Sequence, residues 1–308
     1  LNSKDFLTYK FKKSDISILA IPGIAGLNPT LKAIQFSKKV LVANKESIIC
    51  GWELINKFLK KYKVEILPVD SEHFSIMKLI KGIDKKYIEK IYLTASGGPF
   101  LNHPLKSMKK ILPSEAINHP KWKMGKKISI DSATMINKVY EVIEARNIFN
   151  IPYQKIKILV HPKSYVHCII KFDNGLIKII LHETTMKIPI FNTLYFNLNK
   201  KIYSKSIDLK KLNELNLQEV DLKRFPMVKI LKFLPNKHSL FETVIVSAND
   251  CLVELFLNKK INYVNIQEEL FKIINNKEFN KYKNIFPKNV RDIIELNNYV
   301  HLLGSLTA

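Results

Sequence analysis

The chain has 308 residues, of which 46% are hydrophobic, so it can bury a sizeable core, and its length predicts about two domains. No apolar run approaches the ~20 residues of a membrane-spanning helix. Cys50, Cys168 and Cys251 lie too far apart to indicate a disulfide framework or a paired-cysteine metal site. We therefore expect free thiols in a reducing compartment. The formal net charge of +23 favours anionic partners, but only three of the 50 basic residues are arginines, and the lysines accompany Asn and Ile as in proteins from genomes poor in G and C.

The first 70 residues alternate short apolar runs with helical patterns. Residues 16–21, 40–43 and 64–68 are predicted to be buried strands, and residues 28–37 and 48–62 the helices between them. This order is typical of an open parallel sheet, in which ligands bind beyond the carboxyl ends of the strands. Six polar residues follow two of these ends: Asn44, Lys45, Glu46, Asp70, Ser71 and Glu72.

The Asp70-Ser71-Glu72 sequence places two carboxylates close together. Two such groups repel each other unless a proton or a cation lies between them. Oxygen ligands suit a hard divalent ion such as Mg²⁺ or Mn²⁺, and Glu141 could complete a three-carboxylate site. A solvated acidic turn is the alternative.

The stretch 126–146 is predicted to join a strand to a helix. Residues 128–130 alternate like the end of a strand, and residues 131–134 are rich in helix-capping side chains. The helix N-terminus would favour phosphate through its free N–H groups. Four polar residues would gather near the first helical turns: Ser132, Asn137, Lys138 and Glu141. The alternative is an ordinary amphipathic helix with a polar outer face.

Two loops lie between these motifs. A strand over residues 91–94 leads into Ser96-Gly97-Gly98, where glycine allows backbone N–H groups to approach an oxyanion, although a plain tight turn is equally compatible. Residues 118–127 form a polar loop that carries Trp122 and Met124. Large apolar side chains on a solvated loop indicate either a lid that closes on a ligand or residues folded back on the core.

The remaining chain predicts an α+β region followed by helices. Strands are expected over residues 157–160, 167–172 and 176–181, with an antiparallel hairpin turn at 173–175. Helical patterns follow over 227–233, 240–257, 266–275 and 288–299. We therefore predict an α/β fold in four parts: the remainder of a dinucleotide-binding parallel sheet (1–70), a catalytic α+β domain (71–199), a linker (200–224) and a C-terminal helical bundle (225–308).

Several longer motifs carry a resemblance to a known family. They are ANKES (43–47), PVDSEH (68–73), SGGPF (96–100), HPKWKMGKKISIDSATMINK (119–138) and HPKSYVH (161–167). In this order they resemble 1-deoxy-D-xylulose-5-phosphate reductoisomerase over essentially the whole chain. The resemblance implies an enzyme that uses NADPH and Mg²⁺, Mn²⁺ or Co²⁺ to rearrange and reduce 1-deoxy-D-xylulose 5-phosphate to 2-C-methyl-D-erythritol 4-phosphate, on the non-mevalonate route to isoprenoids.

The resemblance also implies roles for individual residues. The metal ligands would be Asp70, Glu72 and Glu141. Substrate contacts would come from Ser71, Glu72, Ser96, His119, Ser132, Asn137, Lys138 and Glu141. Lys45, Glu72, His119 and Trp122 would act in catalysis, with His167 and Met186 near the reacting end. Asn44, Glu46 and Gly125 would contact the nicotinamide half of the cofactor.

The start of the chain departs from the family. It opens at Leu1, and nothing before Ile16 resembles the family's first strand and its Gly-rich turn, so we expect an N-terminally incomplete chain that binds NADPH poorly. A non-catalytic remnant of the enzyme is therefore one alternative function, and a basic nucleic-acid-binding protein is a weaker one. The resemblance favours a homodimer in a bacterial cytoplasm or a plastid stroma, without a nucleic-acid or membrane partner.

Overall fold

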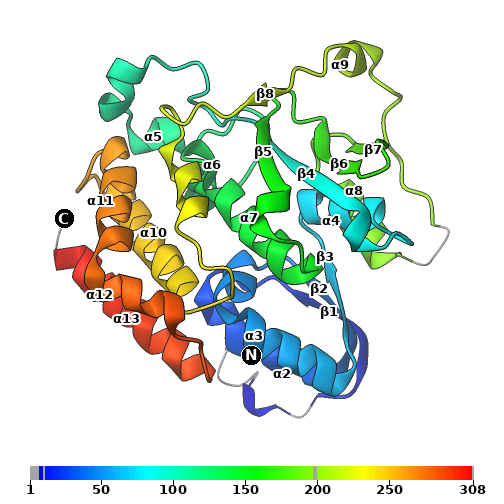
Figure 1. Ribbon diagram of the computed structural model, residues 1–308, viewed down its shortest axis with the longest axis horizontal. Coiled ribbons are helices and arrows are strands. Elements are labelled where there is room, and N and C mark those ends of the chain that lie inside the picture. The colour runs from blue at the N-terminus through cyan, green and yellow to red at the C-terminus, as the bar shows by residue number, and fades with distance from the viewer. Residues whose placement is uncertain (1–6, 10, 197–199, 307–308) are drawn as a thin grey trace.

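A computed structural model describes residues 7–9, 11–196 and 200–306. Its first sheet contains three parallel strands in the order β1-β2-β3 (Figure 1). The strands are β1 (Ser14–Leu19), β2 (Ser37–Val42) and β3 (Glu65–Pro68), and the helices between them are α2 (Leu27–Phe36) and α3 (Lys45–Tyr62). The predicted strand–helix alternation is confirmed, and it brings the carboxyl ends of β2 and β3 side by side.

The second sheet contains five strands in the order β7-β6-β4-β5-β8. They are β4 (Ile88–Ala95), β5 (Ile156–Val160), β6 (Val166–Phe172), β7 (Ile177–Leu181) and β8 (Gln218–Glu219). β4 and β5 are parallel, and the remaining pairs are antiparallel, including the predicted β6–β7 hairpin. β8 lies in the expected linker, so part of that segment adds the last strand to the sheet.

Two helices pack on the second sheet and carry polar residues toward the first. α4 (Ser71–Leu79) contacts β6 and β7, and α7 (Ile136–Phe149) contacts β4 and β5. Their inward residues, such as Ile76 and Val142, join Ile91 and Ile170 of the strands in one hydrophobic core. Burial of this apolar surface fixes both helices, which contact each other, and α4 also contacts β3.

The strand predicted at residues 128–130 is wrong. These residues lie in α6 (Lys126–Ala133), and α7 begins after a turn at Thr134 and Met135. Three alternating residues fit a strand, but contacts one helical turn apart decide the conformation: Lys127 pairs with Asp131, and the Thr134 hydroxyl donates to the Ile130 carbonyl.

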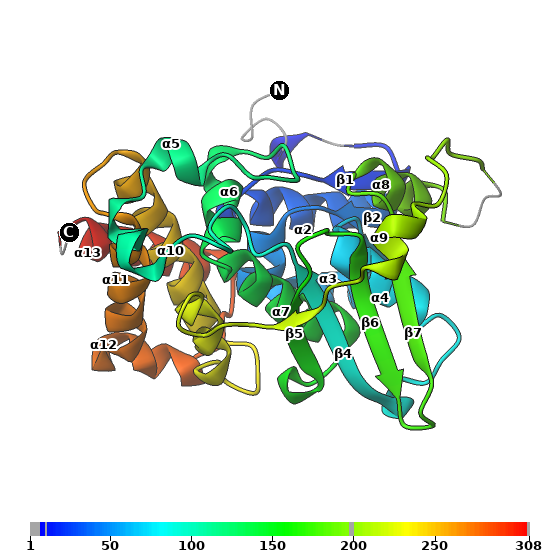
Figure 2. The same cartoon turned by 90° about the horizontal axis from the view of Figure 1, so that it is seen from above.

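The C-terminal part is helical, as predicted, although residues 226–232 form a 3-10 helix. Its α-helices are α10 (Phe241–Leu257), α11 (Tyr263–Asn275), α12 (Lys277–Asn280) and α13 (Val290–Leu306). Figure 2 shows them at the opposite end from β7, and α10 contacts α6. Apolar side chains of α10, such as Phe241 and Ile245, share one core with α2 and α3. The domain boundaries themselves stay a prediction.

Shorter helices connect these parts: α5 (Pro113–Ala116), α8 (Lys187–Leu194) and α9 (Leu209–Asn213). Short 3-10 helices occur at Ile24–Gly26, Lys85–Tyr87, Leu105–Lys110, Tyr153–Lys155 and Lys281–Asn284. Within the described ranges, every helix is too short or too polar to cross a membrane.

Candidate functional site

The site begins where β2 and β3 end together. Val42 pairs with Pro68 in register, so Lys45 and Asp70 emerge from neighbouring strand ends. Asp70 is the N-cap of α4 and accepts the backbone N–H of Glu72 at 3.1 Å. The Lys45 ammonium lies 2.5 Å from the Asp70 carboxylate. The two polar groups predicted at the strand ends therefore meet.

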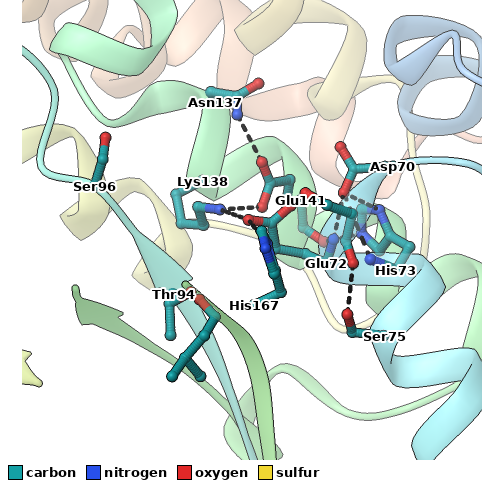
Figure 3. Close-up of polar contacts among 12 residues, drawn as sticks. Asp70, Glu72, His73, Ser75, Thr94, Ser96, Asn137, Lys138, Glu141 and His167 are labelled. Carbon is teal, nitrogen blue, oxygen red and sulfur yellow. Dashed lines mark hydrogen bonds and ion pairs between the residues drawn. The ribbon is translucent and has the colours of Figure 1, made fainter. Parts of the chain in front are cut away.

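Asp70 also belongs to a group of three carboxylates that converge here. Glu72 comes from the first turn of α4, and Glu141 comes from α7 and is buried. One ligand atom from each of Asp70, Glu72 and Glu141 lies within 4.8 Å of the other two, and in the described part of the chain this is the one such group of three His, Cys, Asp or Glu residues. The side chains of this group point toward one another in Figure 3. The helix α7 thus supplies the third carboxylate that the sequence suggested.

Ammonium and amide groups surround Glu141. Lys138 contacts both Glu141 and Glu72, with 3.1 Å between its nitrogen and the Glu72 carboxylate. The Asn137 amide donates to the other Glu141 oxygen at 2.6 Å, and the Ser71 hydroxyl donates to Glu72 at 2.5 Å. Each acid therefore keeps a defined orientation.

The cluster holds more negative charge than its lysines compensate. Burial raises the pKa of Glu72, but the Lys138 ammonium and the His167 ring together outweigh this effect and lower the pKa to about 2. Burial and the neighbouring Glu72 raise the pKa of Glu141 to about 7. A carboxylate that resists ionisation beside two others, in a set of oxygen donors, fits a hard divalent cation between them.

Two buried residues that the sequence interpretation missed support the cluster. His73 donates through Nε2 to the Glu141 carbonyl at 2.8 Å and approaches Asp70 through Nδ1 at 3.1 Å. Burial lowers the pKa of His73, but Glu144 and Asp70 outweigh it and raise the pKa to about 9. Glu144 also lies 3.4 Å from the Lys45 ammonium. Both residues sit inside motifs already noted, one position after Glu72 and three after Glu141.

Ser96 and His119 form a second polar pair. The His119 ring accepts the backbone N–H of Trp122 through Nδ1 at 2.9 Å, so its proton lies on Nε2 and donates to the Ser96 hydroxyl at 3.0 Å. Burial lowers the pKa of His119 to about 4, which keeps the ring neutral. The Gly98 N–H also donates to Ser96 rather than facing an open site, at 3.1 Å. Gly98 has a φ of 65°, and an added Cβ would lie 3.0 Å from the backbone of Ala133.

One cavity of about 260 Å³ joins these groups. The predicted residues that line it are Lys45, Asp70, Ser71, Glu72, Ser96, His119, Trp122, Ser132, Asn137, Lys138, Glu141, His167 and Met186. Met135 and Ser164 also line it, with left-handed φ values of 66° and 49°. Such backbone strain in non-glycine residues concentrates at functional sites. A sequence pattern gives no signal for such a left-handed backbone conformation.

The three residues assigned to the cofactor lie outside this cavity lining. The Asn44 amide donates to the carbonyls of Ile21 and Gly23, and its oxygen caps α3. The Glu46 carboxylate lies 2.9 Å from the Lys127 ammonium. Gly125 is the exposed N-cap of α6. Their role toward a cofactor stays a prediction.

Comparison with known families gives three matches along the chain. Residues 6–51 match 1-deoxy-D-xylulose 5-phosphate reductoisomerase, residues 66–149 match a C-terminal domain of that enzyme, and residues 181–301 match the DXP reductoisomerase C-terminal domain. Together these matches cover most of the chain in family order.

Individual relatives agree. The chain is 58% identical to 1-deoxy-D-xylulose 5-phosphate reductoisomerase from Pelagibacter ubique, over 94% of this chain and 75% of that protein. It is 42% identical to the enzyme from Wolbachia pipientis, over 92% of this chain and 72% of that protein. A crystal structure of DOX-P reductoisomerase with NADPH, fosmidomycin and magnesium superposes with a TM-score of 0.88, at 31% identity, over 99% of this chain and 77% of that chain. The structure of the Zymomonas mobilis enzyme in complex with NADPH superposes with a TM-score of 0.87, at 32% identity, over 99% of this chain and 78% of that chain.

Proposed function

Because the chain belongs to the 1-deoxy-D-xylulose 5-phosphate reductoisomerase family, we propose that its cavity is where 1-deoxy-D-xylulose 5-phosphate is rearranged and reduced to 2-C-methyl-D-erythritol 4-phosphate. The observation that carries the proposal is the carboxylate group of Asp70, Glu72 and Glu141, which opens on the cavity between two lysines. The turns of α4 and α7 that supply Glu72 and Glu141 are held in place by the hydrophobic core of the second sheet.

Asp70, Glu72 and Glu141 would hold a divalent metal. Bound there, Mg²⁺ or Mn²⁺ supplies positive charge that polarises the carbonyl and hydroxyl oxygens of the substrate. Lys45 and Lys138 orient the acids and keep Asp70 and Glu72 ionised, since their ammoniums contact these two carboxylates directly. Lys45 lies closest to the strand ends, where it would also face the substrate.

The substrate phosphate would bind near the α6–α7 junction. Ser96, Ser132, Asn137 and Lys138 offer hydroxyl, amide and ammonium donors around the α6–α7 junction. Because His119 is neutral and donates to Ser96, that serine hydroxyl can donate onward to a phosphate oxygen. A phosphate held far from the reacting carbons fixes the substrate's orientation.

The loop 118–125 would act as the lid. Trp122, Lys123 and Met124 line the cavity, and the Trp122 ring meets His167 edge-on at 6.5 Å between centroids. Closure of large apolar side chains over the substrate excludes water and strengthens the electrostatic interactions inside. The cofactor NADPH supplies the hydride, and Asn44, Glu46 and Gly125 would lie toward its nicotinamide half.

We also propose that the protein works as a homodimer in the bacterial cytoplasm. β7 is an edge strand with two exposed large apolar side chains, Ile177 and Ile179, and the exposed Leu176 directly precedes it, which supports association through this edge. A monomeric mass in light scattering at micromolar concentration contradicts the dimer.

Ligand binding tests the proposed site. We expect the chain to bind fosmidomycin only with Mg²⁺ or Mn²⁺ present, and Glu141→Gln to abolish both binding and turnover while the protein stays folded. Removing one carboxylate of three leaves the cation without its third anionic ligand. Glu53→Gln, at an exposed site on α3, is the matched control and keeps wild-type binding. Retained metal-dependent binding in Glu141→Gln contradicts the assignment.

A further inference from the structure

A second histidine lies directly behind His167. The rings of His167 and His182 are stacked, with 3.7 Å between centroids and 15° between planes. His167 belongs to β6 and lines the cavity, whereas His182 follows β7, is buried and lies outside the cavity lining. One imidazole of the pair therefore faces the site, and the other supports it.

Trp122 extends this pair to a row of three rings. Its indole meets His167 edge-on, at 68° and 6.5 Å between centroids. The row thus runs from the lid to the cavity wall and then to the end of β7. The edge-to-face contact of Trp122 is a geometry that aromatic pairs favour, and the two imidazoles lie nearly face to face at van der Waals distance.

The backbone around His182 fixes its ring. The His182 N–H donates to the Tyr165 carbonyl at 3.1 Å, and its Nδ1 donates to the Glu183 carbonyl at 2.7 Å. The Thr184 hydroxyl donates to the Ser164 carbonyl at 3.0 Å, which ties the same segment to the cavity wall. Two residues further along the chain, Met186 lines the cavity itself. The segment is therefore anchored on both sides of the stack.

We propose that His182 is a positioning residue of the substrate site, whose ring holds the imidazole of His167 in the plane that receives Trp122 of the lid. In this plane His167 Nδ1 lies 3.8 Å from the Glu72 carboxylate. Without a planar ring behind it, the His167 imidazole regains rotation about its side chain, and the lid closes on a less ordered partner. The inference rests on the proposed function of the same cavity.

Three replacements separate stacking from other effects. His182→Phe keeps a planar ring, whereas His182→Leu and His182→Met keep apolar bulk without one. We expect His182→Leu to weaken Mg²⁺-dependent fosmidomycin binding about fivefold, which corresponds to one aromatic pair, and to reduce the change in tryptophan fluorescence on binding. His182→Phe stays within about twofold of the unsubstituted chain by the same reasoning. Trp122→Phe shows which part of the signal comes from Trp52.

The outcomes are distinct. A merely structural His182 lowers the melting temperature but leaves the affinity and the Trp122 signal of the folded protein unchanged, and this result overturns the proposal. The proposal is also overturned if the His182→Phe protein fails to fold or binds fosmidomycin as weakly as His182→Leu, because the proposal requires only a planar ring at this position. His182→Met replaces His182→Leu if the latter does not fold. If the unsubstituted chain fails to bind fosmidomycin with Mg²⁺, the proposed function itself fails.

Discussion

Two clusters of the described residues gather carboxylates around lysines, and one of them lines the cavity. The first holds Asp70, Glu72 and Glu141 with Lys45 and Lys138, and all five line the cavity. The second, the Lys127 cluster, consists of Lys127, Glu46, Asp131 and Asp250. Its ammonium lies 2.9 to 3.1 Å from the three carboxylates, and none of the four residues lines the cavity.

The comparison shows that composition alone does not distinguish a ligand site from a scaffold. Both clusters contain more acids than bases, and both join three helices: the first takes side chains from α3, α4 and α7, and the Lys127 cluster from α3, α6 and α10. They differ in that the first lines the cavity and the Lys127 cluster does not. The Asn249 amide also donates a hydrogen bond to the Asp131 carboxylate at 2.8 Å. Since the lid ends at Gly125, two residues before Lys127, this cluster anchors the lid's end to the C-terminal helices. We therefore expect the first cluster to govern binding and the second to govern stability.

The largest stability effect should come from Lys127→Met. It leaves three carboxylates around a position without a cation, and breaking a buried ion pair costs 3–5 kcal/mol. Because the Lys127 side chain is 33% exposed, we expect a loss of about 3 kcal/mol in the free energy of unfolding. Urea denaturation measures it. Lys126→Met removes the same charge from the exposed neighbouring position and should change stability little; equal losses in both variants contradict a special role for the cluster.

A smaller effect concerns pH and Asp250. Burial raises the pKa of Asp250 to about 7, although Lys127 opposes the rise, and Asp131 and Glu46 add to it. A carboxyl group with a raised pKa in the folded state stabilises the protein fully below its unfolded pKa, and this contribution is lost as pH rises toward 7. Asp250→Asn should therefore flatten the stability profile, reducing the difference between pH 5 and pH 7 by about 2 kcal/mol. Chemical denaturation at both pH values tests this, and parallel profiles for the two proteins contradict it.

Local pattern and strand-end geometry predicted the first cluster well. The apolar runs that became β2 and β3 placed Lys45 beside Asp70, and the motif after residue 131 placed Asn137, Lys138 and Glu141 on one helix. These relations depend on neighbours in sequence or on adjacent parallel strands, which a sequence reveals. The α6 helix was missed because three alternating residues carry too little periodicity to separate strand from helix.

The Lys127 cluster and the His167–His182 stack were beyond prediction for a different reason. Lys127 meets Asp250 only because α6 packs against α10, and His182 meets His167 only because the β6–β7 hairpin pairs in one register. Neither Asp250 nor His182 is marked by a local motif. Packing between distant segments decides such contacts, and a single sequence does not display it.

The smallest effect, and the sharpest test of the comparison, is the response of stability to Mg²⁺. Because the first cluster fits a divalent cation, a metal concentration tenfold above its Kd should stabilise the folded protein by about 1.4 kcal/mol, and EDTA should reverse the gain. Glu141→Gln should lose this response, whereas Asp250→Asn should keep it, although both changes convert a carboxylate beside a lysine into an amide. Thermal unfolding with and without Mg²⁺ measures both variants. A response lost in Asp250→Asn as well means that the two clusters are coupled and that access to the cavity does not separate their roles.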